Sequence, residues 1–350
     1  MSLTTAKVTI SDVARASGVS PATVSLALRN KAGISTETRQ RVLDVAQTLG
    51  YLLQPPNKSA QRVDIRSIGV LLKTRPDDVA ITQSFYGSVV AGVEEVCRRQ
   101  QLHLVFANLL VDLENRPVEP PRLLFEQPTD GLLLIGMQID TAALSLFQQQ
   151  STPIVLVDAY VEHDPYDAVV TDNFAGAYAA TKHLIAQGHR HIAIVGSQPQ
   201  TFPSVMERRA GYCQALADQG LQPYYWDCPL WPKTAHEACL TYLRRSPSPL
   251  TAFFCCNDAV AISLMGALQE QGYTVPHDFS VIGFDNIELA QHTTPPLSTM
   301  LVDKVGMGRL AAQLLINRIE YPAAAPVRSW IRPSLIARQS VAHKTGGLRD

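Results

Sequence analysis

From Ser67 onward, short apolar runs alternate with longer segments in which apolar residues recur at helical spacing. Helical spacing is clear at Val89, Val93 and Val96 and over residues 177–187. The runs of strand length are residues 68–72, 102–107, 131–135, 154–157, 168–170, 192–195, 252–255 and 281–284. This alternation predicts an α/β fold of parallel sheets covered by helices. Ligands bind such sheets at the carboxyl ends of the strands, so polar side chains at those ends are candidate contacts.

The first fifty residues show a different pattern, with short helical segments in place of strand-like runs. Thr9 can cap a helix over residues 10–16, and Asp12 stands at the third position, where a carboxylate can bond back to the cap. Gly18 follows where the chain needs a left-handed residue to leave the helix. The sequence therefore predicts a helix that ends in a tight turn.

Two further helices follow within a few residues. Ser20 caps a helix over residues 21–30, with Pro21 at its first position. A third helix begins after Ser35 and ends at Gly50. The apolar residues that would close a small core between the three helices are Val13, Ala14, Val19, Val24, Leu28, Val42 and Leu49. Three short helices with a tight glycine turn between the first two predict a helix-turn-helix domain.

This head is basic, whereas the rest of the chain is acidic. Residues 1–66 contain nine Lys or Arg and four Asp or Glu, a net charge of +5. The other residues contain 21 basic and 27 acidic side chains, a net charge of −6. A basic head on an acidic body is typical of a nucleic-acid-binding module fused to a second function.

In a helix-turn-helix domain the second helix enters the major groove, and its N-terminal side chains meet base edges. Hydroxyl groups suited to phosphate oxygens of double-stranded DNA are those of Thr9, Ser11, Ser20, Thr23 and Ser25. Such contacts fix the register of the protein on the duplex rather than read its sequence. The alternative is that these residues only cap helices and form turns, and for Ser20 both roles can hold.

Residues 8–51, VTISDVARASGVSPATVSLALRNKAGISTETRQRVLDVAQTLGY, resemble the N-terminal domain of the LacI/GalR family of transcriptional regulators. The resemblance implies base-reading positions at Pro21, Ala22 and Leu26, where many members have hydrogen-bonding side chains. Apolar groups there can touch thymine methyl groups but cannot form bidentate hydrogen bonds, which implies a non-standard operator. Arg29 stands where relatives often have Asn and can contact phosphate or base, and Asn30 is a further expected DNA contact.

Relatives follow this domain with a short hinge helix, whose leucine enters the minor groove and kinks the DNA. In residues 51–66, YLLQPPNKSAQRVDIR, ungapped alignment puts Ala60 at that wedge position. A helix that starts at Pro56 would offer Val63 instead. A proline-rich spacer that never becomes helical is the alternative, and the sequence leaves the choice open.

The body resembles the two-lobed, periplasmic-binding-protein-like (type I) core of the same family, up to about residue 342. Matching segments include DGLLLIG, TDNFAGAY, GHRHIAIVG and VPHDFSVIGFDN. The implied domains are a helix-turn-helix domain of residues 8–52, a linker of 53–66, an N-terminal lobe of 67–172 and 297–328, and a C-terminal lobe of 173–294 and 332–342. The chain would cross between the lobes near residues 171–172, 295–296 and 328–332.

In this core the effector binds in the cleft between the lobes. The resemblance implies effector contacts at Phe85, Tyr86, Asp158, Arg208, Trp231, Asn257 and Asp285. Carboxylates, an amide and a guanidinium can bind vicinal hydroxyls, and an aromatic ring can cover the apolar face of a sugar. Nucleobase-sensing members share the scaffold, and the two neighbouring aromatics, Phe85 and Tyr86, would suit either ligand.

Some of these positions have competing interpretations. Leu230 competes with Trp231, because the alignment there can shift by one residue. For each aspartate at a strand end, the alternative is a turn or a helix cap. We expect Asp258, next to Asn257, to cap its helix rather than meet the effector.

Other classes of function have little support in the sequence. The apolar runs are far shorter than the ~18 residues that span a membrane, and the N-terminus lacks a signal-peptide core, so a cytoplasmic protein is expected. The six cysteines form no C-x-x-C pair and are expected to be buried, reduced thiols. His189 and His191 lack the partners of a metal site. P-loop, G-x-G-x-x-G, G-x-S-x-G and H-E-x-x-H motifs are absent from the sequence, so we expect neither an enzyme nor a cofactor.

Together these observations predict a ligand-responsive transcriptional regulator, a repressor, with a small-molecule effector that is a sugar. It would bind a pseudo-palindromic operator as a homodimer. The tail after Ile336 has no leucine heptads, so the tetramer of some relatives is not expected. A solute-binding protein for transport, a nucleobase-sensing regulator and an enzyme that uses the cleft are the alternatives.

Overall fold

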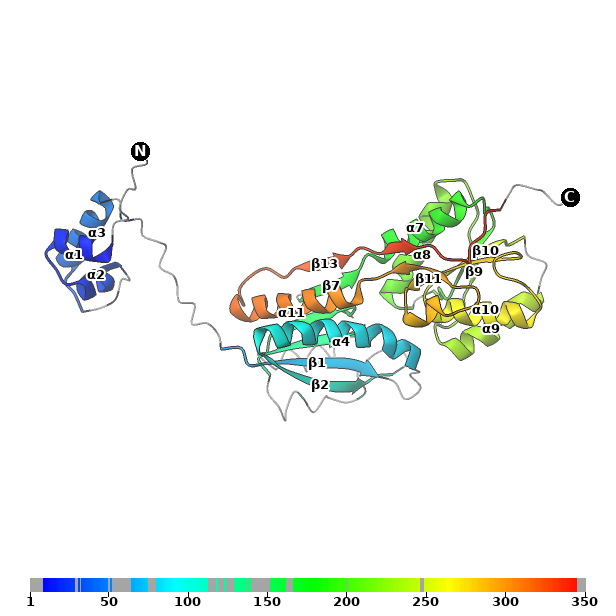
Figure 1. The fold of residues 1–350 in the computed structure, drawn as a ribbon, viewed down its shortest axis with the longest axis horizontal. Coiled ribbons are helices and arrows are strands. Elements are labelled where there is room, and N and C mark those ends of the chain that lie inside the picture. The colour runs from blue at the N-terminus through cyan, green and yellow to red at the C-terminus, as the bar shows by residue number, and fades with distance from the viewer. Residues whose placement is uncertain are drawn as a thin grey trace. The chain divides into compact units, whose positions relative to one another are not determined.

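The computed structural model describes residues 9–28, 31, 33–49, 51, 64–74, 80–112, 118, 123, 129–136, 138–139, 152–161, 166–199, 201–245 and 249–344. The chain forms two compact units, Met1–Asp64 and Ile65–Asp350, and each is described by itself. Figure 1 shows the elements of both units.

The first unit is a three-helix domain. Its helices are α1 (Ile10–Ser17), α2 (Pro21–Leu28) and α3 (Thr36–Thr48), where the sequence predicted them. At the start of α1, the carboxylate of Asp12 accepts hydrogen bonds from the backbone N–H (2.9 Å) and the hydroxyl (2.6 Å) of Thr9. Gly18 ends α1 with a φ of 69°, in the left-handed region that glycine tolerates best.

Serine hydroxyls cap the other two helices. The Oγ atoms of Ser20 and Ser35 accept hydrogen bonds from the N–H groups of Thr23 and Thr38, both at 3.1 Å. The buried core residues are Val13, Ala14, Val24, Ala27, Val42 and Ala46, and Val19 and Leu28 pack against them. The expectation of a buried Leu49 is wrong, because its side chain is 37% exposed beyond the end of α3. Tyr51 packs against the core instead.

The second unit contains two six-stranded sheets. The first has the order β13-β7-β5-β3-β1-β2 and is parallel throughout. Its strands are β1 (Ser67–Thr74), β2 (His103–Leu110), β3 (Gly131–Ile135), β5 (Ile154–Val157), β7 (Asp167–Thr171) and β13 (Arg328–Ile331). Every strand of this sheet except β13 was predicted from an apolar run.

The second sheet has the order β14-β12-β11-β10-β8-β9 and is parallel except for β14, which runs antiparallel to β12. Its strands are β8 (Ile192–Val195), β9 (Tyr224–Trp226), β10 (Ala252–Cys255), β11 (Ser280–Asp285), β12 (Ser298–Leu301) and β14 (Ser334–Ile336). A short parallel pair, β4 (Gln138–Ile139) and β6 (Tyr160–Val161), lies outside both sheets. The sequence predicted β8, β10 and β11 and missed the others.

Helices pack in pairs on the sheets. Over the first sheet, α4 (Ala80–Gln100) packs against α11 (Lys304–Glu320). The second sheet has α7 (Asn173–Ala186) and α8 (Pro203–Ala217) on one face, and α9 (Pro232–Arg245) and α10 (Asp258–Glu270) on the other. The short 3-10 helix η1 (Glu288–Gln291) follows β11. The backbones of α4 and α11 touch, since a Cβ at Gly308 would collide with the carbonyl oxygen of Val89.

The chain crosses between the two sheets three times. The first crossing follows Thr171, where the sequence placed it. The second was expected near residues 295–296, and this is wrong: β12 belongs to the second sheet, so the crossing falls between Leu301 and Lys304. The third falls after Ile331, within the expected range of residues 328–332, and β13 adds residues 329–331 to the first lobe. The second crossing was misplaced because β12 contains polar residues and lacks the apolar run of a buried strand.

The cysteines of the body form no disulfides. Cys97, Cys228, Cys239, Cys255 and Cys256 are buried as expected, whereas Cys213 is half-buried. Among the described residues, no helix is both long enough and apolar enough to cross a membrane.

Candidate functional site

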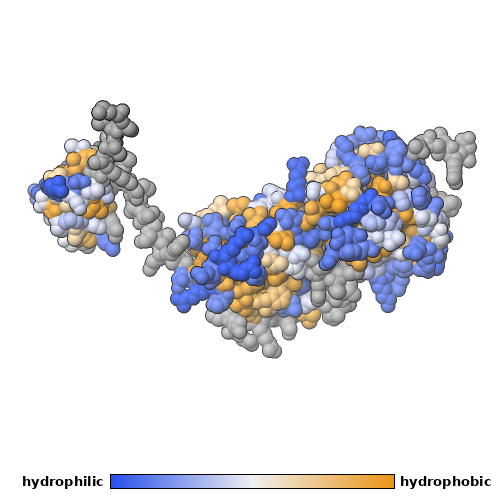
Figure 2. All heavy atoms as spheres, in the orientation of Figure 1, coloured by the Kyte–Doolittle hydropathy of each residue, from blue (hydrophilic) through white to orange (hydrophobic). Residues whose placement is uncertain are grey.

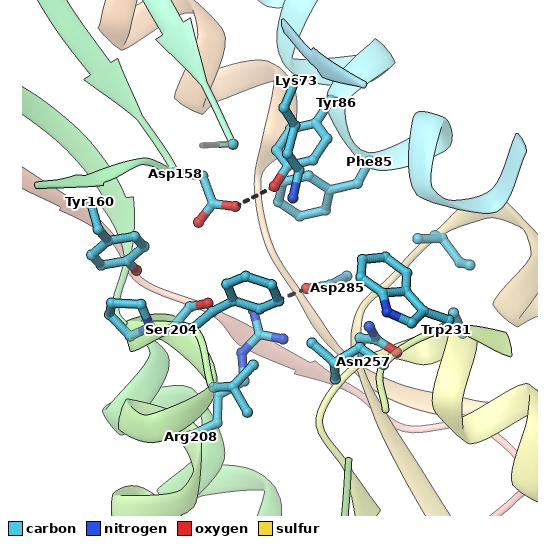
Figure 3. A pocket seen from close by; sticks show the side chains of 17 residues that line it. Lys73, Phe85, Tyr86, Asp158, Tyr160, Ser204, Arg208, Trp231, Asn257 and Asp285 are labelled. Atoms are coloured by element: carbon cyan, nitrogen blue, oxygen red, sulfur yellow. Dashed lines mark hydrogen bonds and ion pairs between the residues drawn. The ribbon is translucent and has the colours of Figure 1, made fainter. Parts of the chain in front are cut away.

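A cavity lies between the two lobes, at the carboxyl ends of their strands (Figure 3). The volume inside it that the centres of water molecules can reach is about 130 Å³. One water needs roughly 10–15 Å³ on this measure, so the cavity has room for a small molecule such as a monosaccharide. All the predicted effector residues line it: Phe85, Tyr86, Asp158, Arg208, Trp231, Asn257 and Asp285. Leu230 lines it as well, so the choice between Leu230 and Trp231 was unnecessary.

Other lining residues were missed by the sequence reasoning. They are Lys73, Gly136, Tyr160, Phe202, Pro203, Ser204, Val205, Ala259 and Ile287. Lys73 and Gly136 come at or just after the ends of predicted strands, so the rule for strand ends could have found them. Phe202 is the N-cap residue of α8 and residues 203–205 form its first turn, and no apolar pattern marks this segment.

Arg208, near the start of α8, is 7% exposed and held on several sides. Its Nε donates to Oδ1 of Asn173 at 2.8 Å, and a terminal nitrogen donates to the carbonyl of Cys256. The other terminal nitrogen lies 3.4 Å from Oδ1 of Asp285. The guanidinium also stacks on the ring of Phe284, 3.9 Å from its centroid. These contacts fix the planar fork of donors in one orientation.

The two carboxylates of the cavity lie on strained backbone. Asp158 and Asp285 have φ angles of 47° and 103°, in the left-handed region that non-glycine residues rarely adopt. Such strain collects at functional sites. Each aspartate directly follows or ends a strand, β5 for Asp158 and β11 for Asp285, as the rule for α/β sheets predicts.

The phenol of Tyr86 donates to Oδ2 of Asp158 at 2.9 Å (Figure 3). Burial raises the pKa of Asp158, and the charge of Arg208 and this hydrogen bond partly offset the rise. Burial also raises the pKa of Tyr86, so its phenol stays protonated and acts as a donor. The hydrogen bond from Tyr86 uses Oδ2 of Asp158, and Oδ1 makes no hydrogen bond to the described residues.

Asp285 faces two cations. Burial raises its pKa to about 6, against the charges of Arg208 and Lys304, which lower it. The Nζ of Lys304 donates to the backbone carbonyls of Asp285 (2.5 Å) and Asn286 (3.0 Å). The carboxylate is therefore ionised in most molecules at neutral pH and can accept hydrogen bonds from a ligand.

The expectation that Asp258 caps α10 is wrong. Asn257 is the cap, and its Oδ1 accepts the N–H of Val260 at 2.8 Å. Asp258 is fully buried and accepts the hydroxyl of Thr299 (2.5 Å) and the N–H of Ile287 (2.8 Å). Burial, then the charge of Asp285, raises the pKa of Asp258 to about 8. Asp258 therefore joins α10 to β12 and to the segment after β11.

The arrangement can bind a ring that carries several hydroxyl groups. Asp158 and Asp285 each keep one oxygen with no hydrogen bond to the described residues, and the amide nitrogen of Asn257 remains a donor. Phe85 and Tyr86 meet edge to face with centroids 5.0 Å apart and form an aromatic wall. Acceptors and donors from both lobes beside flat apolar surfaces are the requirements for such a ligand.

In the head, the start of α2 is open to solvent. Ser20, Pro21 and Ala22 are exposed, as are Thr9 and Ser11 at α1, while Thr23, Ser25 and Leu26 are half-buried. Arg29, Asn30, Ala60 and the expected hinge helix lie outside the described residues. Arg39, which the sequence reasoning missed, donates to the carbonyls of Ala27 (3.1 Å) and Lys31 (2.6 Å) and closes the end of α2.

The structure gives His189 a structural role. His189 is buried and lies 2.9 Å from the hydroxyl of Thr251 through Nδ1. Burial lowers its pKa to about 4. Among the described residues, no group of three His, Cys, Asp or Glu side chains could hold a metal ion.

Comparison with known proteins identifies both parts of the chain. The family of bacterial regulatory proteins named lacI matches residues 9–54, and the periplasmic binding protein-like domain matches residues 181–341. The HTH-type transcriptional repressor PurR of Mannheimia succiniciproducens is 31% identical, over 95% of this chain and 98% of the relative. The ribose operon repressor of Haemophilus influenzae is also 31% identical, over 95% and 98%.

Solved structures agree with this. A complex of the transcriptional regulator CelR with cellobiose is 27% identical with a TM-score of 0.68, and covers 95% of this chain and 99% of its own. A LacI family transcriptional regulator from Enterococcus faecium with bound ribose is 26% identical with a TM-score of 0.65, over 80% and 100%. The lac repressor dimer bound to operator, 24% identical with a TM-score of 0.68 over 96% and 100%, shares the fold.

The three-helix head and the two-lobed body with its cavity therefore define a DNA-binding transcriptional regulator with a ligand-binding core, not an enzyme. The chain belongs to the LacI family. This agrees with the resemblance seen in its first fifty residues.

Proposed function

We propose that this regulator represses transcription in the cytoplasm by binding a pseudo-palindromic operator as a homodimer, and that a sugar in the cavity controls its affinity for DNA. The observation that carries the proposal is the set of polar groups from both lobes around one cavity. Tyr86 and Asp158 come from the first lobe, and Arg208, Asn257 and Asp285 come from the second. A ligand that bonds to both sets favours the closed arrangement of the lobes.

DNA binding is assigned to the start of α2. Pro21, Ala22 and Leu26 would meet base edges, and the hydroxyls of Ser20 and Thr23 would meet phosphates. The other proposed DNA contacts are Thr9, Ser11, Ser25, Arg29, Asn30 and Ala60. A two-fold dimer presents two such helices to the half-sites of a pseudo-palindrome.

A sugar suits the cavity better than a nucleobase. Every hydroxyl of a sugar can donate a hydrogen bond, so several can satisfy the open oxygens of Asp158 and Asp285 at once. A purine base offers few N–H donors to two carboxylates. The cellobiose and ribose found in related regulators support a sugar, while the nucleobase-sensing members that share this scaffold make a purine the competing ligand.

Thermal denaturation of the full chain with sugars and with purines tests the ligand class. A ligand that prefers the native state raises the melting temperature by mass action. We expect a sugar to raise it and Asp158→Asn to abolish the shift. A shift with hypoxanthine or guanine alone would refute the sugar assignment.

DNA selection from random duplexes, followed by sedimentation of the complex, tests the operator and the dimer. We expect two inverted half-sites and two chains for each duplex. A single half-site with one chain would refute the dimer.

A further inference from the structure

We propose that Lys304 is a positioning residue of the effector site, which reaches from the first lobe and holds the turn that carries the carboxylate of Asp285 in the second. Lys304 is the first residue of α11 and directly follows the second crossing between the lobes. It is not one of the residues that line the cavity, so it acts through Asp285. The inference rests on the proposed sugar site and adds the residue that sets one of its acceptors.

The turn after β11 has an unusual backbone. Asp285 and Asn286 have φ angles of 103° and 48°, so two successive non-glycine residues lie in the left-handed region. Such a conformation persists only where the surrounding structure holds it. The second lobe holds the N–H side of the turn: the N–H of Asn286 donates to Oγ1 of Thr299 (3.3 Å), and that of Ile287 donates to Oδ2 of Asp258 (2.8 Å). The carbonyl groups of the turn need a different partner.

Lys304 supplies that partner. Its Nζ lies 2.5 Å from the carbonyl oxygen of Asp285, 3.0 Å from that of Asn286 and 3.4 Å from that of Val302. An ammonium has three N–H donors, so these three carbonyls can take all of them. The same Nζ lies 5.7 Å from the ring centroid of Phe85, in the aromatic wall of the cavity. One ammonium therefore connects the turn of the second lobe to the aromatic wall of the first.

The backbone of Lys304 is fixed within the first lobe. Oδ1 of Asp303 caps α11 by accepting the N–H of Gly306 at 2.8 Å, and α11 packs against α4, the helix that carries Phe85. A change in the angle between the lobes would move this ammonium relative to the turn. The position of the Asp285 carboxylate thus depends on how the lobes are arranged, which is the property that effector binding has to report.

The charge of Lys304 acts on the same carboxylate. Burial raises the pKa of Asp285, and the charges of Arg208 and Lys304 lower it. Of these two cations only Arg208 lines the cavity, so Lys304 can be replaced without removing a group that the sugar touches. The charged or titratable groups around Asp285 are Tyr86, Asp158, Arg208, Asp258 and Lys304.

The pH dependence of sugar affinity tests the inference, because a lysine with a purely structural role would not move it. Titration calorimetry on the full chain measures the affinity for ribose and for glucose on both sides of the Asp285 pKa, which is about 6. In Lys304→Met the fall in affinity toward low pH should begin about one pH unit higher than in the wild type, because a nearby positive charge lowers a carboxyl pKa by at least that much. Asp285→Asn should remove the fall in both backgrounds.

Lys304→Gln separates the charge from the hydrogen bonds. It keeps an N–H donor without the charge, so it should move the midpoint as Lys304→Met does. Above both midpoints Asp285 is ionised in every chain, and a difference in affinity there reports the position of the carboxylate. Lys304→Met should then bind about two- to tenfold more weakly than the wild type, the effect of about one lost hydrogen bond, and Lys304→Gln should lose less.

Arg309→Met is the matched control. Arg309 lies further along α11 and pairs with Glu95 of α4 at 3.3 Å, within the hydrophilic surface of these two helices (Figure 2). This variant removes a cation from the same helix, and it should change neither the midpoint nor the affinity for either sugar.

The outcomes separate the inference from the proposed function. A midpoint that stays in place in both Lys304 variants, or that moves equally in Arg309→Met, overturns the inference and leaves the sugar site standing. If neither sugar binds and hypoxanthine does, the proposed sugar function fails, and melting without ligand decides the inference. The raised pKa of Asp285 makes the chain lose stability as the pH rises from 3.8 to about 6. Lys304→Met should extend this loss to higher pH unless Asp285→Asn is also present, and an unchanged profile overturns the inference. Lys304→Gln carries the decision if Lys304→Met folds poorly.

Discussion

Removing the charge of Arg208 should disrupt both the stability of the body and the binding of its effector. Arg208 is 7% exposed, and its side chain pairs with that of Asp285, which is 14% exposed. Breaking a buried pair on one side costs about 3–5 kcal/mol, because the other charge stays buried without its partner. Arg208→Met should therefore lower the melting temperature by roughly 5–15 °C. It should also abolish the melting shift that the effector causes.

The double variant Arg208→Met with Asp285→Asn separates the two effects. Removing both charges takes away the unpaired carboxylate, so most of the lost stability should return. Effector binding should stay absent, because the cavity has lost its guanidinium and one carboxylate. Differential scanning calorimetry and titration calorimetry measure the two quantities on the same samples.

Arg209 supplies the control for this experiment. It is the next residue of α8 and pairs with Asp227 at 2.7 Å, away from the cavity lining. Arg209→Met should leave effector affinity unchanged and cost less stability, since both side chains of this pair are more exposed. A double variant that binds effector like the wild type, or that is no more stable than Arg208→Met, would contradict both roles of Arg208.

Three further predictions follow from the hydrogen bonds and charges. Folding raises the pKa of Asp258 from 3.8 to about 8, so the chain should lose stability as the pH rises from about 4 through 8. In Asp258→Asn, the melting temperature should depend less on pH over this range. The pKa of Asp285 is raised to about 6. The affinity for a neutral sugar should therefore fall as the pH drops through about 6, because the carboxylate that accepts its hydrogen bonds becomes protonated. Titration calorimetry of Asp285→Asn should show no fall in affinity near this pH, and a fall that persists would contradict the assignment. Ser20 and Ser35 cap their helices with equal geometry, so replacing either by Ala should lower the stability of the head by about 1 kcal/mol in denaturant unfolding. Only Ser20→Ala should weaken operator binding by more than this loss of stability explains. Equal effects of the two variants on DNA affinity would remove Ser20 from the interface.

The sequence alone was sufficient for much of the fold, because the strong signals lie where burial is complete. The strands β3, β5, β8 and β10 are buried at every residue, and such strands appear as unbroken apolar runs. The strands β12, β13 and β14 at or next to sheet edges have mixed patterns. Their register depends on neighbouring strands from distant parts of the chain, and the second lobe crossing was misplaced for this reason.

The candidate site shows the same limit. The family resemblance supplied Asp158 and Asp285, and their places at the ends of apolar strands agree with it, because the topology brings those ends together. Asp258 was assigned wrongly, since a buried carboxylate and a helix cap look alike when two polar residues, Asn257 and Asp258, adjoin. The segment at Phe202 was missed because its approach to Lys73 depends on how the two lobes pack.

In the proposed function, one chain couples an operator site in the head to an effector site in the body. The most direct measurement is the affinity for operator with and without saturating effector, together with the affinity for effector with and without operator, at several salt concentrations. Operator affinity should fall steeply with salt, as phosphate contacts require. Each ligand should also change the affinity of the other by the same factor. A chain that binds no duplex DNA at low salt, or whose affinity for its operator is the same with and without bound effector, would contradict the proposed function.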